Sequence, residues 1–347
     1  AHTHVGLAKS FDQMTPLAVV AARVFQNCEL ALDAGFTTIR DLGGVDGGLV
    51  QAIEQRLVRG PRIFPSGPTI CQSGGHGDIR VPWSHPHENP NGYPGLTVPP
   101  QPCDGPDAVR RIARTAFRRG ATQLKICLTG GLVSLSDEIE DLQMSTDEIK
   151  AAVYEATSRS SYVTAHVHTS EGIIHGLKGG IRCFEHGSFL DESTAVALVA
   201  EKADLVPTLA ATYLMKKHWA DWGMSASMVV RLDEVIDASK CSIRIASQKG
   251  VRLGLGSDLL GPNQSGRALE LALRSTICGP METIVAATRI NAAICGLLDC
   301  GIVEEGMRAD LIAIDFNPLE TPENWADPNR VRLVIKGGQI VKNSLPS

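Results

Sequence analysis

The sequence lacks the features that mark a membrane protein or a nucleic-acid-binding protein. None of its apolar runs reaches the roughly 18 residues that a membrane-spanning helix needs. The net charge is −5 and no basic patch stands out, which argues against a nucleic-acid partner. Because the first residues combine neither a charged segment nor an apolar one, we also expect no signal peptide in this chain. A hydrophobic content of 43% is that of a globular protein rather than a disordered one.

The cysteine and glycine motifs of common cofactor sites are also missing. None of the nine cysteines forms a C-x-x-C pair, which excludes a zinc ribbon or a thioredoxin motif. The paired glycines fit neither the G-x-G-x-x-G nor the Walker pattern, so phosphate or dinucleotide binding is a weak hypothesis. An odd number of scattered cysteines indicates reduced thiols, and we therefore expect a cytoplasmic location.

From residue 15 to residue 257 the chain alternates between helical stretches and short β-branched runs. Glycines such as Gly35 and Gly120 end the helical stretches, and this alternation is typical of a parallel sheet. If residues 2–4 end a first strand, the strand count reaches eight, the number that closes a (β/α)8 TIM barrel. The other predicted strands cover residues 36–41, 62–66, 123–128, 162–166, 182–186, 204–209 and 251–257.

Two regions do not follow this alternation of helices and strands. Residues 67–105 are rich in Gly, Pro and His, and a loop of that length is usually functional or disordered. After Gly301, apolar runs at 302–303, 310–314 and 331–335 predict three short strands. We therefore predict an α/β chain with a (β/α)8 barrel over residues 1–300. Residues 301–347 are predicted to form the C-terminal part of a small β-sandwich-like domain.

Six polar side chains fall at or just after the ends of predicted strands. In a TIM barrel the carboxyl ends of all strands lie on one face, where the active site is built. Two of the six, separated by a single residue, face the same side of the first strand and can share one ion. The set consists of His2, His4, Lys125, His166, His186 and Asp258.

The chemistry of these side chains suits a pair of metal ions. Imidazole and carboxylate groups bind Zn²⁺ and tolerate Mn²⁺, Co²⁺ or Fe²⁺. Four histidines, one aspartate and one bridging group suffice for two ions about 4 Å apart. Lys125 can supply the bridge, because burial lowers the pKa of a lysine and the neutral amine can take up CO₂ as a carbamate. We therefore expect two divalent ions, with zinc the first choice, bridged by a carbamate of Lys125.

Each of these residues also has an ordinary structural interpretation. A single buried histidine such as His166 or His186 is more often a hydrogen-bonded core residue than a ligand. Lys125 can pair with a core carboxylate, and Asp258 can be only a helix N-cap. His2 and His4 can lie at the chain end by chance or as the remnant of a purification tag. The coincidence of all six with strand ends favours the metal site.

Three further residues are candidates for substrate contact. His168 lies two residues past His166 and therefore faces the same side of its strand. His76 lies in the long loop, a position that favours function, although it can equally be a solvated surface residue. Tyr213 follows the seventh predicted strand and can equally be a packed core tyrosine.

Short motifs along nearly the whole chain resemble the amidohydrolase superfamily of metal-dependent hydrolases. Within that superfamily, the chain is most similar to the prolidase-like, imidazolonepropionase-related group of binuclear carboxypeptidases and dipeptidases. The motifs lie at residues 1–6, 35–41, 73–78, 125 with 129–131, 165–168, 184–187, 256–258 and 306–311.

The resemblance implies a role for each ligand. It assigns the more buried ion to His2, His4 and Asp258. It assigns the second ion to His166 and His186, and it makes the carbamate of Lys125 the bridge between the ions.

The resemblance also implies a reaction. A metal-bridging hydroxide attacks a carbonyl carbon, while Asp258 accepts the proton and passes it to the leaving amine. In similar proteins a tyrosine at the position of Tyr213 contacts the carbonyl or carboxylate of the substrate. His76 and His168 are candidates by position alone: His76 for assisting at the substrate, and His168 either for contacting the substrate or for competing as a ligand. The expected substrate is an amide beside a C-terminal amino acid, such as a dipeptide or an N-acyl amino acid.

Two alternatives stay open at this point. A urea, carbamate or cyclic amide can be cleaved on the same metals, because substrate choice depends on loops at 67–105 and 210–224. The other alternative is an inactive protein that serves as a scaffold. It arises because related chains carry tens of residues before the motif that contains His2 and His4. On that basis we expect a truncated first strand whose neighbours keep unpaired edges, and C-terminal strands without their sheet partners. We expect a small-molecule substrate and a homo-oligomer.

Overall fold

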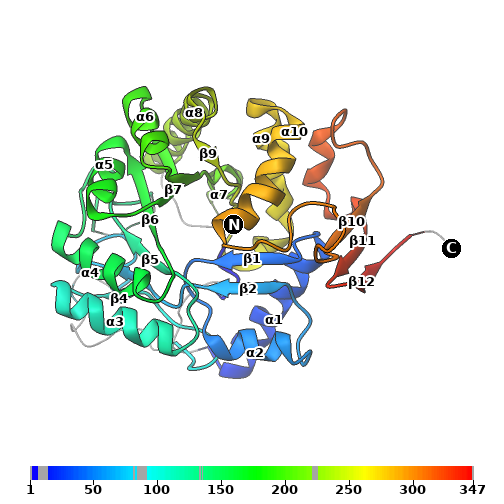
Figure 1. Ribbon diagram of the computed structural model, residues 1–347, viewed down its shortest axis with the longest axis horizontal. Coiled ribbons are helices and arrows are strands. Elements are labelled where there is room, and N and C mark those ends of the chain that lie inside the picture. The colour runs from blue at the N-terminus through cyan, green and yellow to red at the C-terminus, as the bar shows by residue number, and fades with distance from the viewer. Residues whose placement is uncertain are drawn as a thin grey trace.

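A ring of parallel strands forms the centre of the molecule, and helices surround it (Figure 1). The computed structural model describes residues 2–6, 15–80, 83, 92–132, 134, 136–220 and 226–345. The ring consists of residues 2–4, β1 (Thr38–Asp41), β2 (Arg62–Pro65), β5 (Leu124–Cys127), β6 (Val163–Thr169), β7 (Cys183–Phe189), β8 (Asp204–Val206) and β9 (Arg252–Leu253).

Backbone contacts close the ring on both sides of residues 2–4. Thr3 pairs in parallel with Asp41 at the end of β1. On the other side, the amide of Ser257, beyond β9, donates to the carbonyl of His2 at 3.1 Å. The expected α/β barrel is therefore confirmed, and the short first strand has partners on both sides at its carboxyl end.

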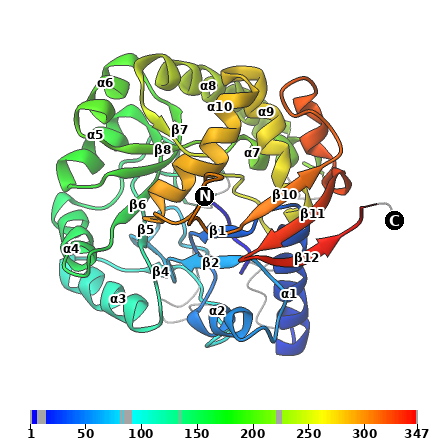
Figure 2. The same cartoon turned by 45° about the vertical axis from the view of Figure 1, so that its right-hand side comes forward.

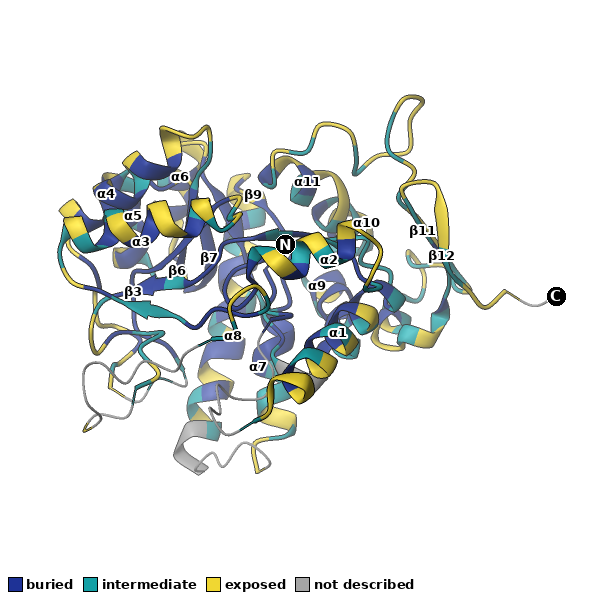
Figure 3. Ribbon diagram, turned by 90° about the horizontal axis from the view of Figure 1, so that it is seen from below, coloured by how far each residue is buried: buried dark blue, intermediate teal, exposed yellow. Residues whose placement is uncertain are grey.

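The helices alternate with the strands and cover the outside of the ring. Their inner faces are buried and their outer faces are exposed, as Figure 3 shows. The main core lies between β5–β9 and these helices, and it includes Ile126, Ala165 and Phe184. The helices are α1 (Leu17–Asp33), α2 (Gly47–Glu54), α3 (Pro106–Arg118), α4 (Thr146–Thr157), α5 (Ser170–Gly179), α6 (Glu192–Ala200), α7 (Leu209–Lys217), α8 (Ala226–Lys249), α9 (Leu269–Cys278), α10 (Pro280–Val285) and α11 (Asn291–Ile294).

The predicted loop at 67–105 contains two short strands, although residues 81, 82 and 84–91 lie outside the described residues. β3 (Thr69–Cys71) follows β2 and pairs in parallel with β5. β4 (Gln101–Pro102) pairs with the other edge of β3. The long loop is thus fastened to the barrel at both ends, at the rim where β5 ends.

The predicted strand at 204–209 is wrong in its second half. β8 ends at Val206, and α7 begins at Leu209, directly after Thr208 in the N-cap position. A continuous apolar run does not distinguish a buried strand from the first turn of a buried helix. The early start of α7 places that helix against the carboxyl end of the barrel.

Three antiparallel strands form a small sheet beside the barrel (Figure 2). They are β10 (Leu311–Ile314), β11 (Val331–Lys336) and β12 (Gln339–Asn343). The strand predicted at 302–303 is wrong, because Val303 is 87% exposed and belongs to no strand. The third strand is β12 instead, reached through Gly337 and Gly338, whose φ angles of 57° and 77° suit a tight hairpin turn. The boundary between barrel and tail at residue 300 stays a prediction.

Candidate metal centre

The predicted ligands surround one cavity of about 440 Å³ at the carboxyl end of the barrel strands. They come from five parts of the ring: two from the first strand and one each from β5, β6, β7 and the turn after β9. The ligands that line the cavity are His2, His4, Lys125, His166, His186 and Asp258, together with His76 and His168.

His2, His4 and Asp258 form the tightest group. The two imidazole Nε2 atoms lie 3.1 Å apart, and each lies 3.1 Å from Oδ1 of Asp258. Two ligands at about 2.1 Å from a tetrahedral zinc ion are roughly 3.4 Å from each other. These three donor atoms are therefore spaced almost as they would be around one ion.

The outer nitrogen of each histidine faces an oxygen atom, which orients the ring. Nδ1 of His4 lies 2.9 Å from the carbonyl of Gly43, and Nδ1 of His2 lies 3.0 Å from Oε2 of Glu185. Each Nε2 is consequently directed at Asp258. A partner on the second ring nitrogen is the usual arrangement for a metal-binding histidine.

His166 and His186 lie next to this group. Their ring centroids are 4.6 Å apart, and the ring of His186 is 4.9 Å from that of His2. Nδ1 of His186 is bonded to Oγ1 of Thr208 at 2.7 Å, and Nε2 of His166 lies 3.1 Å from the carbonyl of Gly130. Burial holds the pKa of both histidines well below the usual range, so both are neutral. A neutral imidazole is the form that binds metals.

Lys125 contributes a buried nitrogen to the cluster. Its ammonium nitrogen is buried and has no hydrogen-bond partner among the described residues. Burial lowers the pKa of the amine, while nearby Glu185 and Asp258 oppose that shift. A buried polar atom without a partner is rare in a native protein, so this nitrogen fits a site that another group completes.

The sequence profile of the Amidohydrolase family matches residues 1–341. The chain belongs to the amidohydrolase family. Members of this family generally use divalent metal ions. The donor set of imidazoles, one carboxylate and one unpartnered buried lysine fits that requirement.

Several known proteins resemble this amidohydrolase over most of their length. The ochratoxinase of Aspergillus niger is 32% identical over 339 residues, which cover 92% of this chain and 68% of the ochratoxinase. A prolidase solved in complex with N-methylphosphonate-L-proline is 36% identical, with a TM-score of 0.93 over 99% of this chain and 85% of the prolidase. A Xaa-Pro dipeptidase solved with bound methionine is 27% identical, with a TM-score of 0.85 over the same shares.

These comparisons confirm the predicted resemblance to prolidase-like amidohydrolases, and the chain is an enzyme of this family. In the described part of the amidohydrolase, no helix is both long enough and apolar enough to cross a membrane. All nine cysteines are free thiols. The cytoplasmic location and the homo-oligomeric state stay predictions.

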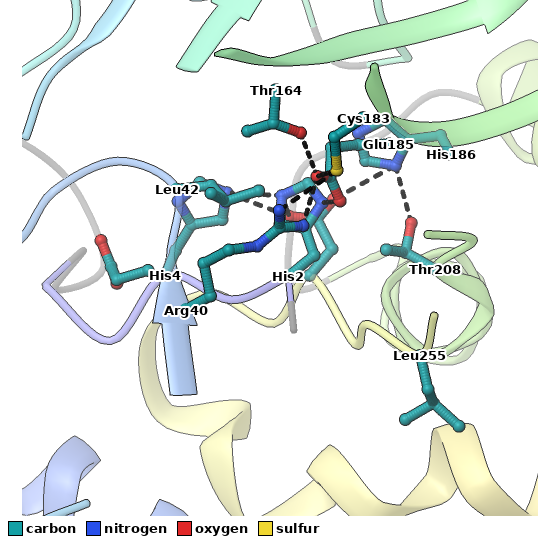
Figure 4. A network of polar contacts seen from close by, with 12 residues as sticks. His2, His4, Arg40, Leu42, Thr164, Cys183, Glu185, His186, Thr208 and Leu255 are labelled. Carbon is teal, nitrogen blue, oxygen red and sulfur yellow. Dashed lines mark hydrogen bonds and ion pairs between the residues drawn. The ribbon is translucent and has the colours of Figure 1, made fainter. Parts of the chain in front are cut away.

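Sequence reasoning missed the buried group that supports His2 (Figure 4). Glu185, on β7, faces His2 with one carboxylate oxygen and accepts from Arg40 at 2.5 Å and from the Thr164 hydroxyl with the other. Burial would raise the pKa of Glu185, but the charges of Arg40 and His2 hold it well below its usual range. Arg40 and Glu185 lie inside two of the quoted motifs, at 35–41 and 184–187, which was the available signal.

Asp41 is a second supporting residue that was not predicted. Its Oδ2 accepts from the amide of Val5 at 2.8 Å, and its Oδ1 accepts from the amides of Gly43 and Val45 at 3.2 Å. The carboxylate thus joins the end of β1 to the chain directly after His4. It fixes the segment that carries the first two predicted ligands.

The predicted substrate residues differ in position. His76 stacks on His166 with ring centroids 3.9 Å apart, and its Nδ1 is bonded to Oγ of Ser134 at 2.7 Å. His168 bonds Ser188 through Nδ1 at 2.9 Å and also lines the cavity. Tyr213 is not among the described residues that line the cavity. It packs against the main core, and the ammonium nitrogen of Lys240 lies 5.7 Å from the centroid of its ring.

Proposed function

We propose that this amidohydrolase uses two metal ions to hydrolyse an amide bond in a dipeptide or an N-acyl amino acid. The observation that carries the proposal is the gathering of six ligand-type side chains around one cavity. The unpartnered nitrogen of Lys125 lies among them.

Under this proposal, His2, His4 and Asp258 hold one ion, and His166 and His186 hold the other. Lys125, carboxylated by CO₂, contributes to both, and zinc is the first candidate metal. When bound, such ions polarise a carbonyl group and make water a stronger acid.

The chain's own residues then perform the proton transfer. The carboxylate of Asp258 accepts the proton of the attacking water and returns it to the leaving nitrogen, as a general base that becomes a general acid. Its side chain is 23% exposed, whereas that of His2 is 1% exposed, so Asp258 borders the open part of the cavity. Glu185 keeps the Nδ1 proton on His2, so that Nε2 is free to bind.

The cavity wall supports a substrate with an apolar side group. Leu132, Met215 and Val235 line it together with the histidines. His76 and His168, beside the ligand histidines, are the proposed polar contacts for the substrate. The prolidase, the Xaa-Pro dipeptidase and the ochratoxinase named above favour an amide beside an amino acid as the substrate. The predicted contact between Tyr213 and the substrate stays a prediction.

Elemental analysis of the protein, purified without chelating resins, tests the proposal. We expect about two equivalents of zinc or a related ion per chain, as the six ligands imply. A panel of Xaa-Pro dipeptides, N-acyl amino acids and aryl ureas then tests the substrate class. A cooperatively folded protein without metal would overturn the metal site and favour an inactive scaffold. Turnover of ureas alone would overturn the substrate class.

A further inference from the structure

The N-terminus of α7 lacks the usual capping bond from its own N-cap residue. Thr208 occupies the N-cap position, but its hydroxyl makes no bond to the first turn of the helix. That hydroxyl bonds Nδ1 of His186 at 2.7 Å instead (Figure 4). A threonine at this position normally satisfies one of the free amides of the first turn, so another group must do so here.

Glu270, on α9, replaces the missing cap. Its Oε2 accepts from the amides of Leu209 and Ala210, both at 2.7 Å. The side chain is fully buried, and Arg274, one turn later on α9, is fully buried as well and donates to the carbonyl of Gly254 at 3.3 Å. Glu270 therefore joins α9 to the first turn of α7.

We propose that Glu270 is a positioning residue for the metal centre, which acts on His186 through Thr208. Because Glu270 caps α7 from outside, the Thr208 hydroxyl stays available to orient His186. The same turn of α7 carries Ala211 and Thr212, which line the cavity. The inference rests on the proposed function only where it treats His186 as a metal ligand.

The chain offers a matched control for this role. Glu148 is another buried glutamate that accepts from backbone amides, those of Gly105 and Ser145, both at 2.6 Å. It caps α4 on the outside of the barrel and does not line the cavity. Glu148→Ala should thus reproduce the loss of a buried cap without disturbing α7.

The first test is hydrogen–deuterium exchange of the purified holoenzyme. Glu270→Ala should speed exchange of the peptide that covers residues 208–215 by at least about tenfold, because the first-turn amides lose their acceptor. Glu270→Gln keeps a carbonyl acceptor and should stay close to the wild type. Equal protection of this peptide in Glu270→Ala and Glu148→Ala would overturn the proposal. If Glu270→Ala does not fold, Glu270→Asp, whose carboxylate is one methylene shorter, replaces it.

The second test measures zinc affinity by competition with a chelator. Glu270→Ala should weaken the more labile zinc equivalent by about 10- to 100-fold, the usual effect of removing an outer-shell partner. Thr208→Ala should do the same, and the double variant should be no weaker than either single variant. Additive losses would show that Glu270 does not act through Thr208. A folded protein that binds neither zinc nor any related divalent ion would refute the proposed function, while the exchange experiment would still decide the role of Glu270 at α7.

Discussion

His186 and Asp258 carry the greatest backbone strain among the proposed ligands. Their φ angles of 69° and 53° lie in the left-handed region, which costs on the order of 1–3 kcal/mol per residue and persists where the surroundings impose it. His186 lies within β7 and Asp258 lies in the turn after β9, and both line the cavity. The strain is thus located where the proposed chemistry takes place.

Replacing these two residues should separate metal binding from proton transfer. His186→Ala removes a ligand, so we expect about one metal equivalent fewer and the loss of most activity. Asp258→Asn keeps an oxygen donor, so substantial metal should remain while turnover falls on the order of 10²- to 10⁴-fold. Elemental analysis and steady-state kinetics measure both effects. Wild-type rates in Asp258→Asn would refute its role as proton shuttle.

The buried pair of Arg40 and Glu185 is expected to affect stability as well as activity. Both side chains are fully buried, so Glu185→Gln removes the charge that offsets the guanidinium. Breaking such a pair typically lowers the free energy of unfolding by about 3–5 kcal/mol. Urea denaturation of Glu185→Gln, Arg40→Met and the double variant measures the coupling between them. If the two single losses simply add, the pair contributes no interaction energy.

Lys125 should make metal uptake depend on dissolved CO₂. Burial lowers the pKa of its amine, which favours the neutral form that reacts with CO₂. Enzyme stripped of metal should therefore recover activity with zinc faster when bicarbonate is added than in CO₂-depleted buffer. Lys125→Ala should show no such acceleration. Equal recovery of the wild type in both buffers would contradict the carbamate.

At the residue scale, the sequence reveals ligands more readily than their supports. A histidine or lysine at the end of an apolar strand is visible as an exception to the local pattern, which is how His166 and Lys125 were found. Glu185 is equally exceptional, but its partners Arg40 and Thr164 lie 145 and 21 residues away. Only the pairing of strands brings them together, so their role follows from the fold.

At the scale of elements, the contact between α9 and α7 should make stability depend on pH. Burial raises the pKa of Glu270 to about 7, while the charge of Arg274 opposes the shift. An acid whose pKa is raised by folding stabilises the folded state less as pH rises, here from about 4.5 to 7. Glu270→Gln cannot ionise, so its free energy of unfolding relative to the wild type should increase by about 3 kcal/mol between pH 4 and pH 8.

Urea titrations at several pH values check this prediction, with Glu148→Gln measured in parallel. A difference between Glu270→Gln and the wild type that does not change with pH would contradict the raised pKa. The same pH dependence in Glu148→Gln would assign the effect to something other than Glu270.

Element boundaries were predictable where glycine or a cap marks them. Gly35 and Gly120 follow α1 and α3 with φ angles of 92° and 98°, and the predicted helices end there within two residues. The start of α7 carries no such mark, because Thr208 is engaged by His186 and the cap comes from Glu270. A helix whose cap is distant in the sequence is not recognisable from local pattern.

At the scale of the whole molecule, the small sheet and the barrel share one packed interface. Val331 and Val334 of β11 are buried against Leu32 of α1. The ammonium of Lys336 donates to the carbonyl of Gly60 at 2.6 Å, and Arg62 pairs with Asp310 at 2.9 Å. These contacts join the sheet to α1 and β2. β2 pairs with β1, and β1 ends at Asp41, which holds the segment after His4. We therefore expect the two parts to unfold together.

Val334→Ala tests this cooperativity. Val334 is fully buried, and removing two methyl groups there should lower the free energy of unfolding by about 2 kcal/mol through lost burial and the cavity left behind. Because the sheet supports the strand beside His2 and His4, the loss should appear in one transition, with tryptophan fluorescence and metal release following the same curve. Ile340→Ala, at a 62% exposed position of β12, provides the control and should change stability little. If residues 301–347 unfolded in an earlier transition that left the metal bound, the barrel would keep its site without the sheet.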